Sequence, residues 1–201
     1  QMVGAGEAVA RLGKRPERSG QGADEWYSGA EVTRYSAENV QRQRELALAA
    51  LRLLGLHVPL CAWNGDATTD RKPSSAESNG GRRACGGVVL DLGCGSGLSS
   101  AAVREAGALL PPAEQPLLVL GCDLSRAMLQ EARQRMQGPR KGMAAAGLAM
   151  VDFSHELPVR DGVCEHAVSI SAIQWLQTPD ARQQFFASLW RALRPGGRAA
   201  L

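Results

Sequence analysis

The segment VVLDLGCGSGLSS, residues 88–100, constrains the fold more than any other part of this chain. A short apolar run leads into three glycines at alternate positions, Gly93, Gly95 and Gly97. A glycine-rich turn between a strand and a helix presents backbone N–H groups at the helix N-terminus, where they can hold a ligand. The segment therefore predicts a strand–turn–helix unit that binds a ligand.

Strand-like and helix-like segments alternate along the chain after this turn. The predicted strands are 88–92, 117–122, 148–153, 166–171 and a fifth that follows the Pro-Gly-Gly turn at 195–197. The predicted helices are 38–54, the stretch from the glycine turn to residue 106, 126–137 and 180–194. Such alternation is typical of an α/β, Rossmann-like fold with a doubly wound, mainly parallel sheet.

The chain length of 201 residues, with 44% apolar residues, suits one domain with a single sizeable core. We place that domain at 24–201, after a Gly-, Ala- and Arg-rich segment, 1–23, that is expected to be disordered. Small polar residues dominate 61–87, which predicts a flexible insertion. Because the sequence stops just after RPGGRAA, we expect a C-terminally truncated domain whose last strands are missing.

Composition excludes several classes of protein. No run of about 18 apolar residues occurs, so the sequence predicts no membrane span, and residues 1–20 lack the apolar block of a secretory signal. The five cysteines are an odd number without a C-x-x-C pair, which argues against a disulfide framework or a metal site. Reduced thiols indicate a nuclear or cytosolic location. A net charge of +3 permits an acidic partner such as RNA.

The spacing of the glycine turn restricts the ligand. A dinucleotide fingerprint has the spacing G-x-G-x-x-G, whereas Gly93, Gly95 and Gly97 give G-x-G-x-G. Asp91 stands two residues before the first glycine, where a carboxylate would repel a pyrophosphate but would suit an amine or a sulfonium. No Gly-Lys-Ser/Thr follows, which excludes a Walker A motif.

Two further acids follow predicted strands. Asp123 ends the second strand, where it can accept both hydroxyls of a ribose. Asp152 and Phe153 end the third, where the carboxylate can accept an adenine amino group and the ring can stack on the base. An adenosine with a zwitterionic tail fits this set, which predicts S-adenosylmethionine. The alternative is a structural role for Asp91 in the turn and a helix-capping role for Asp123.

Three segments together resemble one enzyme family. DLGCGSGLSS, GCDLSRAML and SISAIQWL are similar to the corresponding motifs of the eukaryotic 18S ribosomal RNA (guanine, position 7) methyltransferases of small-subunit biogenesis, which are class I S-adenosylmethionine-dependent enzymes. SISAIQWL is the specific element, since the glycine motif alone indicates only the superfamily. The resemblance covers residues 24–201.

The resemblance implies a role for individual residues toward the cofactor. By the part of the cofactor that they would contact, these are Gly93, Cys94 and Gly95 (methionine), Asp123 and Leu124 (ribose and adenine), Asp152 and Phe153 (adenine), Ser169 and Ile170 (sulfonium), and Tyr27, Arg34 and Tyr35, which would close over it. One departure is that the family's Gly-Asp-Met reads Val-Asp-Phe at 151–153.

The resemblance also places Gln174 and Trp175 toward the target guanine. Guanine N7 has a free lone pair at neutral pH, so methylation there needs orientation and exclusion of water rather than a general base. Trp175 either stacks on the base, as aromatic side chains do with splayed RNA bases, or belongs to the core. Gln174 either reads an edge of the guanine or ties down its loop.

The expected partners follow from the same resemblance. The apolar segment 147–153 is expected to form an edge strand, and such an edge invites strand addition. The resemblance implies a small zinc-binding activator subunit on this edge, 18S rRNA in pre-40S particles as substrate, and a nuclear or nucleolar, and also cytoplasmic, location.

Two other functions remain open at this point. Methyltransferases that act on a malonyl-carrier or a small molecule have an AVQW-like element after the fourth strand, and they would need carboxylate-binding arginines, for which Arg34 is the clear candidate. A ribosome-assembly factor with dispensable catalysis would keep the cofactor motifs as well.

Overall fold

The fold is described from a computed structural model, which describes residues 20, 22–56, 87–110, 118–137 and 144–201. Almost all of the segment predicted to be disordered, 1–23, and of the insertion predicted at 61–87 lies outside the described residues.

The described residues form one five-stranded sheet in which every neighbouring pair of strands is parallel. The strands are β1 (Val88–Leu92), β2 (Leu118–Asp123), β3 (Ala145–Met150), β4 (Cys164–Val168) and β5 (Leu193–Ala200). Their order is β3-β2-β1-β4-β5. The chain runs outward from β1 to β3, crosses back over the sheet, and then runs outward in the other direction from β4 to β5, so the switch point of the sheet lies between β1 and β4. This order confirms the predicted doubly wound α/β fold.

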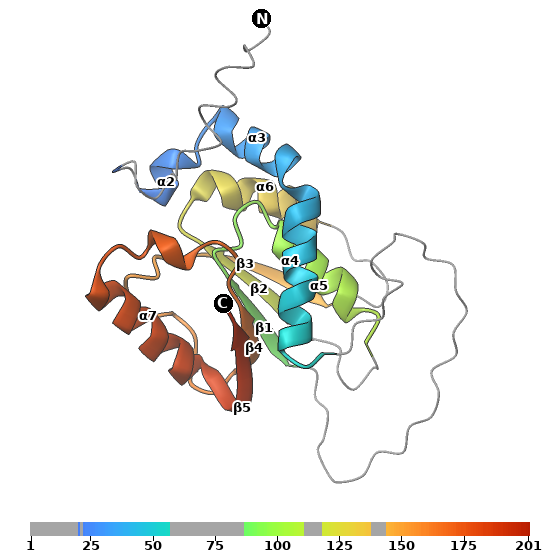
Figure 1. The fold of residues 1–201 in the computed structure, drawn as a ribbon, viewed down its shortest axis with the longest axis vertical. Helices are drawn as coiled ribbons and strands as arrows, with labels where there is room; N and C mark the ends of the chain where they lie inside the picture. Colours follow the sequence, from blue (N-terminus) through green and yellow to red (C-terminus); the bar gives the residue numbers. More distant parts are fainter. Residues whose placement is uncertain (1–19, 21, 57–86, 111–117, 138–143) are drawn as a thin grey trace, which may run out of the picture.

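Helices cover both faces of the sheet and one of its ends. They are α2 (Ala23–Trp26), α3 (Ala30–Glu38), α4 (Val40–Leu53), α5 (Leu98–Gly107), α6 (Arg126–Met136), the 3-10 turn η3 (Ile173–Trp175) and α7 (Pro179–Ala192). Figure 1 shows α4 and α5 side by side on one side of the sheet, α7 on the other, and α2 and α3 above the end where the strands terminate. No described helix is long and apolar enough to cross a membrane.

Two apolar cores, one on each face, fix this arrangement. Successive residues of β1 point to opposite faces. Val89 belongs to the core with Leu51 of α4 and Val103 of α5, whereas Leu90 belongs to the core with Phe185 of α7. All five side chains are buried. The burial of both faces explains why β1 reads as a continuous apolar run rather than an alternating one.

Three strands, β3, β4 and β5, have limits that differ by more than one residue from the predicted ones. β3 runs in register with β2 from Ala145 to Met150, so it begins and ends three residues before the predicted strand at 148–153. β4 ends at Val168 rather than at residue 171. α7 ends at Ala192, and β5 begins directly after it and runs through the expected turn at 195–197, where Gly196 has a φ of +82°. Pairing with neighbouring strands, which local composition does not encode, sets these limits.

β3 is an edge strand of the sheet, as predicted. It is poorly covered for a strand of apolar composition, since Met150 is 66% exposed.

Candidate ligand-binding site

The glycine turn after β1 has the backbone conformation that its sequence predicts. Gly93 and Gly97 both have a φ of +78°, a region that L side chains rarely adopt. A Cβ on Gly93 would also collide with the methyl group of Ala172, and one on Gly97 would lie 2.9 Å from the Cβ of Ala132. The Gly93 N–H donates to the carbonyl of Cys122 at 2.7 Å, which ties the turn to β2. The glycines therefore allow two close approaches, to α6 and to the segment after β4.

A cleft with about 620 Å³ of empty space, partly open to solvent, lies above the carboxyl ends of the strands. Parallel sheets bind ligands at this end, where the strand order reverses. The lining residues are Ala23, Tyr27, Tyr35, Gly93, Gly95, Asp123, Leu124, Met128, Asp152, Phe153, Ile170, Ser171, Ala172 and Trp175.

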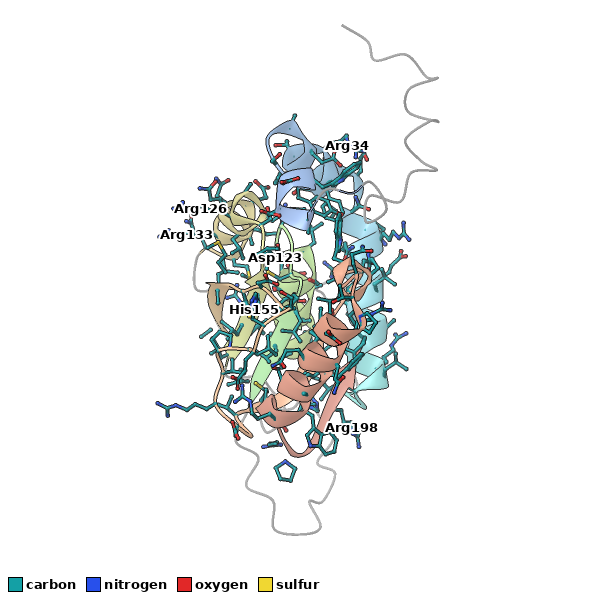
Figure 2. The ribbon with its side chains drawn as sticks, turned by 90° about the vertical axis from the view of Figure 1, so that its left-hand side faces the viewer. Arg34, Asp123, Arg126, Arg133, His155 and Arg198 are labelled. Carbon is teal, nitrogen blue, oxygen red and sulfur yellow. The ribbon has the colours of Figure 1, made fainter. Side chains whose placement is uncertain are left out.

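Asp123 lies at the end of β2, near the centre of the molecule in Figure 2. Its Oδ2 accepts the N–H of Gly95 at 2.8 Å and its Oδ1 accepts the N–H of Ser125 at 2.8 Å. Burial raises the pKa of this carboxyl, and the hydrogen bonds from Ser125 and Gly95 oppose that rise. The carboxylate is thus held rigidly in the lining of the cleft, where its remaining lone pairs can accept hydroxyls.

Asp91 does not line the cleft but lies fully buried beneath the glycine turn. The hydroxyls of Ser99 and Ser100 on α5 both donate to its Oδ2 at 2.6 Å, and its Oδ1 has no hydrogen-bond partner among the described residues. Burial raises the pKa of Asp91 to about 6, against the two serine hydrogen bonds. The geometry therefore gives Asp91 structural contacts with α5, while direct contact with a ligand stays a prediction.

Asp152 and Phe153 lie in the loop that follows β3 rather than on a strand. The N–H and the hydroxyl of Ser154 donate to Asp152 Oδ1 at 2.9 and 2.7 Å, and Nδ1 of His155 lies 3.4 Å from Oδ2. Burial alone would raise the pKa of Asp152, yet Ser154 and His155 hold it below its ordinary value. Phe153 lines the cleft and packs edge-on against Phe185, with the ring centroids 5.9 Å apart.

The opposite wall of the cleft is aromatic. Tyr27, which follows α2, packs edge-on against Tyr35 of α3 at 5.2 Å and against Trp175 of η3 at 5.8 Å between ring centroids. Gln43 of α4 donates to the hydroxyl of Tyr35 at 2.9 Å. Burial is the largest cause of the raised pKa of Tyr35. We call residues 22–38 the lid, because they carry the rings of Tyr27 and Tyr35 over the cleft.

The segment after β4 connects the two walls. The hydroxyl of Ser169 donates to the carbonyl of Leu92 at 2.7 Å and is buried between β4 and β1. Ile170 lines the cleft, and Ser171 beside it has a φ of +58°, a strained conformation for a residue other than glycine. The side-chain amide of Gln174 donates to the Ser171 carbonyl at 2.6 Å, which ties down this turn.

Nine of the fourteen residues predicted for the site line the cleft: Tyr27, Gly93, Gly95, Asp123, Leu124, Asp152, Phe153, Ile170 and Trp175. Tyr35, expected to close over the cofactor, lines it too. Five of the fourteen do not: Arg34, Asp91, Cys94, Ser169 and Gln174.

These five residues fall into two groups. Asp91, Cys94 and Ser169 are buried beneath the cleft and support its floor. Gln174 is exposed and bonds within its own turn. Arg34 pairs with the two carboxylates on its own helix, Glu31 and Glu38, and Figure 2 shows it at the outer end of the molecule, apart from Asp123.

The prediction missed four lining residues, Ala23, Met128, Ser171 and Ala172. Ser171 and Ala172 lie inside the SISAIQWL segment, so that motif could have indicated them. Met128 is a buried residue of α6, as an apolar helix residue is expected to be, and Ala23 carries no local signal. Within the described ranges, no group of three or more His, Cys, Asp or Glu residues is arranged to hold a metal ion.

Comparison with known proteins identifies the domain. Residues 89–197 match the family model described as "Methyltransferase domain". The 18S rRNA (guanine-N(7))-methyltransferase of Mus musculus is 29% identical over 203 residues, covering 96% of this chain and 57% of the mouse protein. The 18S rRNA (guanine-N(7))-methyltransferase RID2 of Arabidopsis thaliana is 35% identical over 119 residues, covering 55% of this chain and 36% of that protein. The chain spans about half the length, or less, of the curated relatives it matches.

Solved structures with low sequence identity share the fold. A chain from the complex between the Haloferax volcanii Trm112 methyltransferase activator and a methyltransferase has a TM-score of 0.53 at 19% identity, covering 89% of this chain and 59% of that one. An S-adenosyl-L-methionine-dependent methyltransferase from Methanococcus maripaludis has a TM-score of 0.54 at 15% identity, with coverages of 85% and 61%. Both matches confirm the predicted fold class.

Proposed function

Since this chain belongs to the methyltransferase domain family, we propose that it transfers a methyl group from S-adenosylmethionine to nitrogen 7 of a guanine in 18S ribosomal RNA. One observation carries the proposal. A single cleft joins the glycine turn and Asp123 to an aromatic wall at Trp175, and none of the described residues that line it is a histidine, lysine or cysteine. The names of the relatives from mouse and Arabidopsis support the same activity.

The residues of the sheet side fit S-adenosylmethionine. Asp123 offers a rigid acceptor for the ribose hydroxyls, since the N–H of Gly95 binds its Oδ2 and the N–H of Ser125 binds its Oδ1. Gly95 also lines the cleft, and a Cβ there would have only Met128 Cε nearby, at 3.9 Å, so a ligand can approach the backbone closely at this position. Phe153 offers an aromatic surface and Asp152 an acceptor at the far side, where the adenine would lie.

The chemistry matches the sparse set of polar groups. The bound cofactor supplies a methyl group on a cationic sulfur, which guanine N7 can accept through its free lone pair. No proton leaves the guanine in this reaction, so the site needs no general base. The protein holds the base in line and excludes water, and Trp175 offers the ring on which the base stacks. Gln174, fixed by Ser171, orients this turn from outside the cleft.

Exposed cations near the cleft support an RNA substrate. Arg126 stands at the first position of α6, directly after Ser125, and Arg133 follows two turns later on the same face. Figure 2 shows both projecting from α6 into solvent. Neither forms an ion pair within the described part of the chain, whereas Glu131, the one acid of this helix, pairs with Arg135. A cation at a helix N-terminus opposes the helix dipole, so Arg126 suits a phosphate contact better than a stabilising role.

A protein partner fits the open edge of β3. An edge strand with exposed apolar residues accepts a strand from another protein, and Met150 is such a residue. We therefore propose that a small zinc-binding activator subunit pairs with β3, as the Trm112 activator forms a complex with the methyltransferase from Haloferax volcanii. Pre-40S particles as substrate imply that the protein acts in the nucleus and nucleolus and also reaches the cytoplasm.

A carrier-protein or small-molecule substrate is disfavoured by the position of Arg34. A malonyl-carrier methyltransferase would need a cation in the cleft for the free carboxylate, but Arg34 pairs with Glu31 and Glu38 outside it.

The test is to incubate the protein and its activator with labelled S-adenosylmethionine and either precursor small-subunit particles or malonyl-carrier. Mass spectrometry then identifies the labelled product. We expect 7-methylguanosine in 18S rRNA, and label on the carrier would overturn the proposal. Cofactor binding without label on either substrate would favour the assembly factor.

A further inference from the structure

The hydroxyl of Ser125 makes two hydrogen bonds of different kinds. It accepts the N–H of Met128 at 3.3 Å, which caps the N-terminus of α6, and it donates to the carbonyl of Tyr27 at 2.9 Å. Tyr27 is 98 residues away along the chain and belongs to the lid. Ser125 is 1% exposed, so both bonds are shielded from water. The backbone N–H of the same residue donates to Asp123 Oδ1 at 2.8 Å.

Capping alone does not require the second bond. A helix cap uses a lone pair of the side-chain oxygen, whereas the proton of the hydroxyl is free to bond elsewhere. Thr178 shows the contrast within this molecule, because it caps α7 by accepting the N–H of Ala181 at 3.1 Å and its hydroxyl is exposed. The bond to Tyr27 is therefore a separate function of Ser125.

Tyr27, the residue to which Ser125 donates, is only half-buried and does not belong to the core. Tyr27 lies between the four-residue helix α2, which buries no side chain, and Gly29, whose φ of +52° precedes α3. Its ring nevertheless contacts both Tyr35 and Trp175. The N–H of Tyr27 donates to Ala23 and the hydroxyl of Ser28 to Glu25, which are bonds within the lid itself, whereas the bond from Ser125 connects this backbone to the end of β2.

We propose that Ser125 is a positioning residue that holds the lid over the cleft and couples it to the cofactor site through Asp123. Ser125 does not line the cleft. Its backbone N–H binds Asp123, and its hydroxyl binds the carbonyl of Tyr27. The ring of Tyr27 in turn contacts Trp175, so Ser125 links Asp123 to the lid. The inference rests on the proposed function, since the ring of Tyr27 contacts Trp175, the residue proposed to face the target guanine.

The test compares Ser125→Ala with Thr178→Ala in the intact protein. Both variants lose one helix cap, and Ser125→Ala also loses the bond to Tyr27, so we expect the larger shift of the denaturation midpoint in Ser125→Ala. Hydrogen exchange of the lid amides is the distinguishing measurement. Loss of one buried hydrogen bond predicts about tenfold faster lid exchange in Ser125→Ala and unchanged lid exchange in Thr178→Ala. Ser125→Thr, which keeps the hydroxyl, should restore protection.

Coupling is tested by repeating the exchange with S-adenosylhomocysteine as the probe. We expect this ligand to slow lid exchange in the wild type and to slow it at least threefold less in Ser125→Ala. If Ser125→Ala does not fold, Ser125→Gly carries the same test, because glycine is a better helix cap than alanine.

Equal lid exchange in the wild type, Ser125→Ala and Thr178→Ala would overturn the inference. That result would leave the proposed activity untouched, because exchange is measured without RNA. Conversely, a wild-type protein that fails to methylate rRNA would refute the proposed function and leave the result on the lid standing.

Discussion

The two walls of the cleft are built in different ways. The sheet wall consists of the glycine turn and Asp123, which follow buried parallel strands and are fixed by backbone hydrogen bonds such as that from Gly93 to Cys122. The lid wall consists of Tyr27 and Tyr35 of the lid together with Trp175 of η3, and these rings meet through edge-on contacts.

The difference matches the two tasks of a methyltransferase. A wall fixed by backbone bonds holds one small ligand in a defined geometry. A wall of side-chain contacts on short helices opens at a smaller cost in free energy, which a bulky substrate such as RNA requires. Changes to the sheet wall should therefore reduce cofactor affinity, and changes to the lid wall should reduce the use of substrate.

The largest effect is expected from Gly93→Ala. The new Cβ combines a φ of +78° with a collision against Ala172, so we expect the affinity for S-adenosylhomocysteine to fall roughly 100- to 1000-fold. Isothermal titration calorimetry measures this change. Gly196→Ala is the matched control, because Gly196 has a φ of +82° but has open space around its Cβ. Equal affinities in the two variants would contradict the close approach at Gly93.

Asp91 should make the stability of the sheet wall depend on pH. Burial raises its pKa to about 6, so the folded protein keeps this proton to a higher pH than the unfolded chain. Stability from the neutral carboxyl is present below pH 4 and is lost as the pH rises toward 7. The loss in free energy of unfolding should be about 3 kcal/mol.

Urea denaturation of the wild type and Asp91→Asn at pH 4.5 and pH 7.5 measures this effect, because the variant lacks the titration. About 1 of the 3 kcal/mol is already lost at pH 4.5, so the wild type should lose about 2 kcal/mol of stability relative to the variant between these two pH values. A stability difference that does not change with pH would show that folding does not raise the pKa of Asp91.

Asp123→Asn should sharpen the contrast between two acids of the cleft. The amide would present an N–H₂ group to one of the N–H donors, Gly95 or Ser125, and so we expect cofactor affinity to fall about 30-fold. Asp152→Asn, in the loop after β3 with a side chain 44% exposed, should cost only about threefold. Calorimetry with S-adenosylhomocysteine compares them, and a larger loss at Asp152 would reverse the assignment.

A smaller effect than that of Asp123→Asn is expected at the lid wall. Trp175→Ala should lower kcat/KM for rRNA about tenfold through lost stacking, while the affinity for S-adenosylhomocysteine changes less than threefold. Trp190→Ala is the control, since Trp190 is 83% exposed on α7 and lies outside the cleft. A loss of cofactor affinity as large as the loss of kcat/KM would show that both walls serve the cofactor.

The sequence by itself determined the parts that depend on local conformation. Glycines that need a positive φ identify the turn, and apolar runs between helical periods identify the parallel sheet, because the backbone preferences of these residues act over a few positions. Asp123 was located for the same reason, as the residue that ends a buried strand before a capped helix.

Tertiary structure alone decided which of the predicted side chains reach the cleft. Arg34 and Tyr35 are neighbours on one helix, yet only Tyr35 faces the cleft, because the packing of α3 on the domain turns Tyr35 toward the cleft and leaves Arg34 exposed. Asp91 lies within the recognised motif but is buried against α5. The bond from Ser125 to Tyr27 joins segments 98 residues apart. Contacts between distant segments fix the direction and burial of a side chain, and no local pattern of residues encodes them.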